Sequence, residues 1–416
     1  MMGKPVAIVL GGTAPHCELI KELKRRGYYT ILLDYLKDPI AKKFADEHVI
    51  ESTLDKEAVY RVAKERNASL VISAAVDQAN ISACYALEKL GLFAPYSYET
   101  ADRITNKGVM KEEMIRHGIP TSKYMYFDQG QEITDLELRY PVMVKPADSN
   151  SSNGVKKANS FEEMCVYLKD AQKISRNGRA VVEEFVTGRE ISAYCFIKDH
   201  KAKLIMTAER VCVTEGEEKA IKCYATIAPA RISEKAAKRA EEVTTMIANA
   251  FGINNSPLFT QAMVNGDDLF VIEFAPRVGG GTSFKTVRKN TGFDLISAAL
   301  DSYLGNDVSF ETLHAPENIY VINILYGNKG IFDHIEGMEA LAGEGIIEEF
   351  IPYKTAGTEV DPSRASSSRL GTFIVKASDT AELNERIRKA YARIEAYDTE
   401  GNPILRHDLN IVDQNA

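Results

Sequence analysis

The sequence predicts a multidomain protein of mixed α/β and α+β class, and three observations support this prediction. The chain has 416 residues, which corresponds to two to four domains. Short apolar runs alternate with helical segments in the first hundred residues, as in a parallel sheet. Several strand-like runs then follow one another from Ile191 to Ala228, which predicts a meander. We therefore expect domains at residues 1–100, 101–315 and 316–416.

The N-terminal domain is expected to be a Rossmann-like parallel sheet with strands at residues 6–10, 30–34 and 70–73. Ligands of such sheets bind beyond the carboxyl ends of the strands, where Gly12, Asp34 and Asp77 fall. We expect Gly12 and Asp77 to contact a substrate. The turn Gly-Gly-Thr-Ala-Pro-His does not have the G-x-G-x-x-G pattern, so a nicotinamide-dependent reductase is a weak alternative.

The central domain is expected to begin with a charged helix from Asp102 to about His117. The predicted strand Tyr140–Pro146 then carries Lys145 near its end, and a small, polar loop at residues 149–154 follows it. The remaining elements are expected at residues 160–170 (helix), 180–186 (strand), 234–251 (helix), 258–263 (strand) and 269–275 (strand). The Asn-Gly turn at residue 265 predicts that the last two strands form a hairpin.

The segment from Leu269 to Gly281 is the most informative part of the chain. Glu273 lies near the end of an apolar run, Arg277 follows four residues later, and three glycines begin at Gly279. A carboxylate held by a strand can bind a cation, an arginine can face an anion, and glycines let a ligand approach the backbone. The segment therefore indicates metal and phosphate chemistry, although a buried strand followed by a flexible loop is the plain alternative.

The C-terminal domain is expected to contain strands at residues 320–325 and 372–376 and a helix at 380–397. The net charge of −8 argues against nucleic acid as the main partner, and no apolar run has the roughly 20 residues of a membrane span. Six scattered cysteines indicate reduced thiols, and the first residues lack a signal-peptide pattern. We therefore expect a cytoplasmic protein.

Lys107, Lys145, the segment from Glu183 to Glu190 and the segment from Glu273 to Arg277 together resemble the motifs of the ATP-grasp superfamily. The branch that the chain resembles contains glycinamide ribonucleotide synthetase, the carboxyaminoimidazole ribonucleotide synthetases, biotin carboxylase and the carbamoyl-phosphate synthetase large subunit. The similarity covers nearly the whole chain. It implies ATP and Mg²⁺ or Mn²⁺ as cofactors.

The resemblance implies a nucleotide site in which Lys107 and Lys145 contact the phosphates and a mobile loop covers them. Main-chain groups after Glu183, together with its carboxylate, correspond to the adenine contacts, and Glu190 corresponds to the acid that holds the ribose. The residues expected to bind ATP are Lys107, Lys145, Ser149, Ser151, Ser152, Gly154, Glu183, Glu184, Phe185, Val186 and Glu190. Residues 120–188 correspond to a lid subdomain.

The resemblance also assigns Gln261 and Glu273 as metal ligands on paired strands, and Arg277 and Lys145 as catalytic residues. Relatives usually have an acid where Gln261 stands and an asparagine where Ala275 stands, so this metal site has fewer protein ligands than usual. Asp268 is a candidate for a further ligand. The residues expected to contact the substrate are Arg277, Gly279, Gly280, Gly281, Ser283, Gly12, Asp77 and Arg369.

The implied activity is that of an ATP-dependent ligase. A carboxylate attacks the γ-phosphate to give an acyl phosphate and ADP, and an amine or another nucleophile then displaces phosphate. A purine-pathway enzyme like the phosphoribosylamine–glycine ligase is the first expectation, and an amino-acid or dipeptide ligase is the second. An ATP-binding sensor or subunit of weak activity is the alternative from another class. The expected partners are ATP, small carboxylates and amines, and a second copy of the chain in a homodimer.

Overall fold

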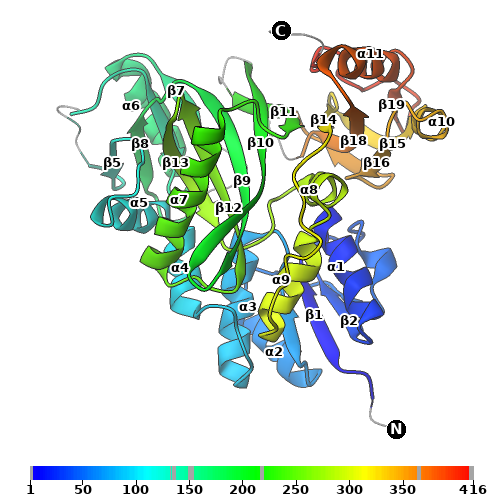
Figure 1. Cartoon of the computed structure of the whole chain (residues 1–416), viewed down its shortest axis with the longest axis horizontal. Coiled ribbons are helices and arrows are strands. Elements are labelled where there is room, and N and C mark those ends of the chain that lie inside the picture. Colours follow the sequence, from blue (N-terminus) through cyan, green and yellow to red (C-terminus); the bar gives the residue numbers. More distant parts are fainter. Residues whose placement is uncertain are drawn as a thin grey trace.

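The computed structural model describes residues 3–131, 133, 137–148, 154–215, 220–362 and 367–411. Within this part of the chain the strands form four sheets, one of which has eight strands and spans two of the expected domains. In Figure 1 the N-terminal domain lies at the bottom, the lid at the upper left and the last hundred residues at the upper right. The mixed α/β and α+β class is confirmed.

The N-terminal sheet is parallel with the strand order β3-β2-β1-β4, as the alternating pattern predicts. Its elements are β1 (Val6–Leu10), α1 (Ala14–Arg25), β2 (Tyr29–Leu33), a 3₁₀ turn (Lys42–Phe44), β3 (Glu47–Val49), α2 (Lys56–Glu65), β4 (Leu70–Ile72) and α3 (Asp77–Leu90). Helices cover both faces of this sheet, so its inner strands are buried. Their sequences are therefore continuous apolar runs. Strand β3 was not predicted, since its residues Glu47, His48 and Val49 are only half buried.

The single helix expected from residue 102 is wrong in detail, because the chain forms two helices. They are α4 (Tyr98–Thr105) and α5 (Lys107–Arg116), and Asn106 between them has an extended backbone. The Asn106 side chain accepts hydrogen bonds from the backbone N–H groups of Gly108 and Val109, at 3.1 and 3.3 Å. Asparagine is a strong N-cap, so it starts a new helix and sets the direction of Lys107.

The lid is a four-stranded antiparallel sheet with the order β5-β8-β6-β7, covered by one helix. Its elements are β5 (Tyr124–Phe127), β6 (Val142–Pro146), β7 (Lys156–Ala158), α6 (Phe161–Ile174) and β8 (Ala180–Glu184). The apolar side chains between sheet and helix form a separate small core. The lid is therefore a packed unit, and it presents β6 and β8 side by side.

The eight-stranded sheet has the order β13-β12-β9-β10-β11-β14-β18-β16, and each neighbouring pair is antiparallel. Its strands are β9 (Arg189–Lys198), β10 (Lys201–Glu215), β11 (Ala220–Ala228), β12 (Ser256–Asn265), β13 (Asp268–Ala275), β14 (Ile319–Tyr326), β16 (Glu349–Pro352) and β18 (Arg369–Ala377). Helix α7 (Glu234–Phe251) covers one face of its first strands (Figure 1). The division at residue 316 stays a prediction, and β14, β16 and β18 continue the central sheet across it.

The remaining elements are α8 (Ser283–Thr291), α9 (Leu295–Leu304), β15 (Gly330–Glu336), α10 (Met338–Gly343), β17 (Thr358–Val360), α11 (Thr380–Tyr391) and β19 (Glu395–Asp398). Helices α8 and α9 share an apolar core with the N-terminal sheet. The Arg26 guanidinium ties α1 to α9 by donating to the Asp301 carboxylate and, at 2.7 Å, to the Ser297 hydroxyl. This packing fixes the N-terminal domain against the segment that follows Arg277.

Candidate active site

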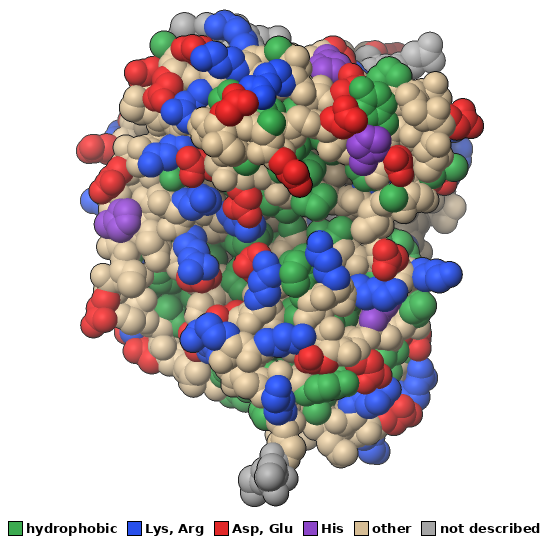
Figure 2. All heavy atoms as spheres, turned by 90° about the vertical axis from the view of Figure 1, so that its right-hand side faces the viewer, with side chains coloured by type: hydrophobic (Ala, Val, Ile, Leu, Met, Phe, Trp, Pro, Cys, Tyr) green, Lys and Arg blue, Asp and Glu red, His purple; other side chains and the backbone are tan. Residues whose placement is uncertain are grey.

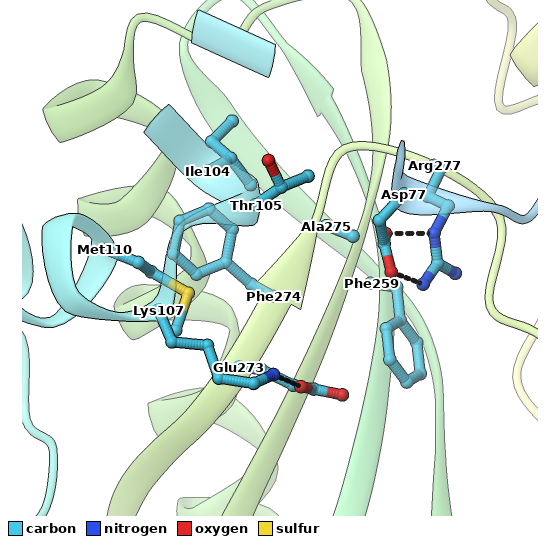
Figure 3. Close-up of a pocket in the computed structure, with 10 residues that line it drawn as sticks. All are labelled: Asp77, Ile104, Thr105, Lys107, Met110, Phe259, Glu273, Phe274, Ala275 and Arg277. Carbon is cyan, nitrogen blue, oxygen red and sulfur yellow. Dashed lines mark hydrogen bonds and ion pairs between the residues drawn. The ribbon is translucent and has the colours of Figure 1, made fainter. Parts of the chain in front are cut away.

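Four charged side chains from three parts of the chain line one pocket between the N-terminal domain and the central sheet. The Lys107 ammonium on α5 lies 3.1 Å from the Glu273 carboxylate on β13. The Arg277 guanidinium makes two hydrogen bonds to the Asp77 carboxylate at the start of α3, one of them 2.8 Å long. Figure 3 shows these two ion pairs on either side of Ala275. The structure thus brings together four residues that the sequence assigns separately to ATP, metal and substrate.

The charges in this pocket stabilise one another. The nearby Lys107 ammonium lowers the pKa of Glu273 to about 2, against the opposing effect of burial. Burial lowers the pKa of Arg277, but Asp77 and the other acidic groups nearby, Glu273 among them, together raise it above its ordinary value. Glu273 is therefore ionised at neutral pH, although 43% of its side chain remains open to solvent. A carboxylate that is ionised and accessible can exchange its lysine partner for a cation.

The predicted pairing of Gln261 with Glu273 is confirmed, because the two residues lie opposite each other on β12 and β13. The Gln261 amide nitrogen donates to Glu190, which also accepts from the Arg210 guanidinium at 2.6 Å. The side-chain oxygen of Gln261 thus remains for another partner. Across the described part of the chain there is no cluster of three or more His, Cys, Asp and Glu side chains that could hold a metal alone.

The suggestion that Asp268 adds a metal ligand is wrong. Asp268 lies at the exposed hairpin turn, opposite Asn265, whereas Glu273 lies five residues further along β13. At about 3.3 Å per residue the two carboxylates are separated by roughly 17 Å along the strand. Ala275 lines the pocket without a ligating atom.

A second set of charges lies where the lid meets α5. The Glu183 carboxylate on β8 forms ion pairs with the Lys145 ammonium on β6 and, at 2.6 Å, with the Lys111 ammonium on α5. Lys111 and Glu183 are both almost completely buried, and the Ser122 hydroxyl donates to the same carboxylate. Although burial opposes the charge, the two lysines hold the pKa of Glu183 far below its ordinary value. A contact between the Glu183 carboxylate and the edge of the adenine ring stays a prediction.

Lys111 is the member of this charge cluster that sequence reasoning missed. It lies four residues after Lys107 on α5, so both side chains project from the same face of that helix. This spacing of four residues could have identified Lys111 once Asn106 was recognised as the N-cap of the helix. Burial lowers the pKa of Lys111 despite its carboxylate partner, as expected for an ammonium with little access to water.

Three other residues predicted to bind ATP lie at the end of β8 and directly after it. Glu184 accepts from Arg139, and the backbone N–H of Phe185 donates to the Pro141 carbonyl at 3.0 Å. The Lys157 ammonium lies 3.8 Å from the centre of the Phe185 ring. The contacts of Glu184, Phe185 and Val186 with adenine stay predictions. The predicted residues Ser149, Ser151 and Ser152 lie outside the described residues, and Gly154 is the first described residue after them.

The three glycines after Arg277 differ in their surroundings. A methyl group on Gly279 would lie 2.9 Å from the Tyr194 ring and 3.1 Å from the Phe259 ring, so this glycine serves packing. The same methyl group on Gly280 would meet no atom within 4 Å, and on Gly281 only the Tyr353 hydroxyl. Open space at the second and third glycines supports the predicted substrate contact there, whereas the structure gives Gly279 a packing role.

The glycine turn of the N-terminal domain is filled by the protein itself. A methyl group on Gly11 would meet the His16 ring at 2.9 Å, and one on Gly12 would meet Pro39 at 2.4 Å. The buried His16 ring accepts from Thr13 and lies 3.4 Å from the Ser73 hydroxyl. In a dinucleotide-binding turn this space admits a pyrophosphate. The structure therefore argues against the nicotinamide alternative, while contact between Gly12 and a substrate stays a prediction.

We expect His16 to make the fold sensitive to mild acid. Burial is the main cause that lowers the His16 pKa from 6.5 to about 4. Between these values the unfolded chain binds one proton more, so the free energy of unfolding falls as the pH decreases, by about 2 kcal/mol between pH 7 and 5. Urea unfolding at both pH values should show this loss in the unaltered chain and a clearly smaller loss in His16→Gln. His200→Asn, which replaces an exposed histidine, should retain the full loss.

Arg369, at the start of β18, donates to the Tyr326 hydroxyl at 3.1 Å, and its charge also acts on the thiol of Cys223. It does not line the pocket at Glu273. Its contact with substrate stays a prediction. Figure 2 shows Lys and Arg side chains on both sides of a hollow across the middle of one face, so the chain presents positive charge locally despite its negative total.

Comparisons with known proteins match this arrangement. Residues 138–285 match the ATP-grasp domain family, and residues 323–397 match the L-amino acid ligase C-terminal domain 2. The chain is 28% identical over 256 residues to the formate-dependent phosphoribosylglycinamide formyltransferase of Ignicoccus hospitalis, covering 59% of this chain and 62% of that relative. It is 24% identical over 400 residues to the Salmonella typhimurium protein of the same name, covering 93% and 95%.

Solved structures of low sequence identity share the whole fold. The L-amino acid ligase of Bacillus licheniformis superposes with a TM-score of 0.79 at 18% identity, over 96% of this chain and all of that one. Phosphoribosylglycinamide synthetase from Anaerococcus prevotii gives 0.73 at 17% identity, over 95% and 100%. The predicted resemblance is confirmed by the match of residues 138–285 to the ATP-grasp domain family together with the shared fold. Among the described residues, none of the helices has both the length and the apolar character needed to cross a bilayer.

Proposed function

We propose that this chain, an ATP-grasp ligase, joins a small carboxylate to an amine and converts MgATP to ADP and phosphate. The observation that carries the proposal is the pocket in which Lys107, Glu273, Arg277 and Asp77 converge. A lysine for phosphate, an ionised acid for a cation and an arginine for a developing negative charge are the groups that phosphoryl transfer to a carboxylate requires.

The reaction has two steps. A carboxylate oxygen of the substrate attacks the γ-phosphorus of ATP, which forms an acyl phosphate and releases ADP. The amine nitrogen then attacks the acyl carbon, the bond to phosphate breaks, and the nitrogen loses a proton to give the amide. Lys107 and Lys145 hold the transferred phosphoryl group, and Arg277 stabilises the charge on the acyl phosphate. The lid and the loop before Gly154 exclude water, which would hydrolyse the intermediate.

Each cation of the pocket already has a partner in the absence of ligands. Lys107 is paired with Glu273, and Arg277 is paired with Asp77. Binding of nucleotide and substrate therefore exchanges these pairs instead of burying new isolated charges. Such exchange keeps the cost of desolvation low, because each arriving phosphate or carboxylate replaces an oxygen that the cation already contacts.

Glu273 and Gln261 are the residues that would hold Mg²⁺ or Mn²⁺. The ionised, accessible carboxylate of Glu273 fits an oxygen-preferring cation, and the opposed Gln261 oxygen adds a weaker neutral ligand. The bound metal would neutralise charge on the ATP phosphates. Two protein ligands suit Mg²⁺, which usually completes its shell with water and substrate phosphates.

The carboxylate substrate that we favour is an amino acid, and the product would be a dipeptide or a related amide. The match of residues 323–397 to the C-terminal domain of L-amino acid ligases favours this second expectation of the sequence. The open backbone at Gly280 and Gly281 leads directly into the N-terminus of α8, where a small carboxylate is favoured. The purine-pathway reaction is the other candidate, favoured by relatives that act on phosphoribosylglycinamide by name.

We further propose that the protein acts in the cytoplasm and as a homodimer. All six cysteines are free, which agrees with a reducing compartment. A biotin carboxylase domain with the same fold is described as a dimer, with a TM-score of 0.73 at 16% identity.

The test of this proposal is ADP release from MgATP with defined pairs of substrates. The panel contains pairs of amino acids, glycine with phosphoribosylamine, formate with glycinamide ribonucleotide, and bicarbonate with aminoimidazole ribonucleotide. We expect ADP formation to require both members of one pair, with the amide identified by mass spectrometry. Tight ATP binding without ADP formation from any pair would instead support the ATP-binding sensor.

A further inference from the structure

Two of the six cysteines lie opposite each other, and one of them contacts Glu190. Cys212 on β10 and Cys223 on β11 are register partners in the antiparallel pair, next to an irregularity in the ladder. The other four cysteines, Cys17, Cys84, Cys165 and Cys195, lie on α1, α3, α6 and β9. Directly opposed residues have Cα atoms about 4.5–5.5 Å apart, which is within the range of about 4.4–6.8 Å that a disulfide needs.

The two thiols interact with each other and with charged neighbours. Each thiol affects the pKa of the other: the Cys212 thiol and the Arg210 guanidinium lower the pKa of Cys223, although burial opposes the shift. The Cys223 thiol raises the pKa of Cys212. The Cys212 thiol also lies 3.6 Å from a Glu190 carboxylate oxygen, to which it donates. Two thiols on directly opposed residues of neighbouring strands can form a disulfide by exchange once one of them loses its proton.

We propose that Cys212 and Cys223 form a reversible cross-strand disulfide that weakens MgATP binding through Glu190. The Glu190 carboxylate accepts from both Cys212 and Arg210, and the Cys223 carbonyl accepts from the Tyr326 hydroxyl at 2.8 Å. Disulfide formation removes the thiol proton that Cys212 donates to Glu190 and ties β10 to β11. The effect on ATP rests on the proposed role of Glu190 at the ribose.

The oxidant is a small disulfide such as glutathione disulfide. One protein thiolate attacks a sulfur of this molecule and releases one glutathione thiolate. The second cysteine, as a thiolate, attacks the mixed disulfide and releases the second glutathione. The two protein thiols lose two protons and two electrons in total, and the two glutathione thiolates take them up. A half-buried Cys212 gives the small oxidant access to a pair whose other member is buried.

The experiment equilibrates the full chain with glutathione buffers of increasing potential, traps free thiols by alkylation and identifies linked peptides by mass spectrometry. We expect a peptide pair that links Cys212 to Cys223, reversed by reductant, and present also in Cys165→Ser. Neither Cys212→Ser nor Cys223→Ser should give it. Formation of only mixed disulfides with glutathione, or full alkylation of both cysteines in the oxidised buffer, would overturn the proposal.

The binding arm measures the Kd of MgATP by calorimetry for the reduced and the oxidised chain. We expect the Kd to rise about 2–10-fold on oxidation, the change that corresponds to one lost hydrogen bond, and to be unaffected by oxidation in the Cys212→Ser/Cys223→Ser double variant. An unchanged Kd in a chain shown to carry the disulfide would overturn the coupling to ATP. A reduced chain that does not bind MgATP would contradict the proposed function, while the peptide analysis would still decide on the disulfide.

Discussion

Replacement of Glu273 by glutamine is expected to lower kcat for ADP formation by about 10²–10³-fold, the usual effect of removing one group that stabilises the transition state. Glutamine preserves the shape of the side chain but removes the charge that balances Lys107 and that we propose holds the metal. The measurement is the rate of ADP release with saturating substrates and varied Mg²⁺. Because a neutral ligand binds Mg²⁺ weakly, the variant should also need a higher Mg²⁺ concentration for half of its remaining rate.

Asp268→Asn is the matched control for this prediction, since it makes the same kind of change on the same strand. Asp268 is exposed at the hairpin turn, away from the pocket, and its variant should keep the rate of the unaltered chain. If Glu273→Gln retained activity within about threefold of the unaltered chain, Glu273 would not be the metal ligand, and the assignment of the pocket would fail.

Much of the pocket could be predicted because local signals specify it. The hairpin turn at Asn265 fixes the register that places Gln261 opposite Glu273. Apolar strands place Lys145 and Glu273 near the ends of β6 and β13. These features depend on residues that are close in the sequence, and the structure confirms them.

The partners of these residues could not be predicted, since they come from distant segments. Asp77 and Arg277 are 200 residues apart, and nothing in either neighbourhood specifies the other. The packing of α8 and α9 against the N-terminal domain brings them together. Lys111 was missed for a related reason: a lysine in a charged helix is usually exposed, and only the position of the lid buries this one.

The continuity of the eight-stranded sheet also escaped prediction. Strand β14 pairs with β11 across about 90 residues of intervening chain, so the expected C-terminal domain shares its sheet with the central domain. Strand patterns show which face of a strand is buried, but they do not identify the neighbouring strand. As a result, Arg369 on β18 and Arg210 on β10 belong to one sheet.

Replacement of Glu183 by glutamine is expected to lower the free energy of unfolding by about 3–5 kcal/mol, the cost of leaving a buried charge without its partner. The change would leave the buried Lys111 ammonium without its carboxylate, and Lys145 would lose the same partner. Urea unfolding at pH 7 measures this loss, and Glu184→Gln is the matched control. Glu184 is the next residue on β8, and its partner Arg139 is 86% exposed, so its variant should lose about 1 kcal/mol or less.

The same substitution distinguishes two roles of Lys145. If Glu183 holds the Lys145 ammonium in the direction of the ATP phosphates, the folded Glu183→Gln variant should bind MgATP more weakly. Glu184→Gln should bind it with the Kd of the unaltered chain, because the adenine contact expected of Glu184 is made by its main chain and its side chain pairs with Arg139. Lys111→Met completes the comparison, because it removes the other lysine and leaves the pair of Glu183 and Lys145 in place. Lys111→Met should therefore lose stability, because the buried ion pair with Glu183 is removed. It should retain ATP affinity, because Glu183 keeps Lys145 and the Ser122 hydroxyl as partners. Equal loss of ATP affinity in Glu183→Gln and Lys111→Met would show instead that the lid as a whole is disturbed, and that Glu183 does not position Lys145.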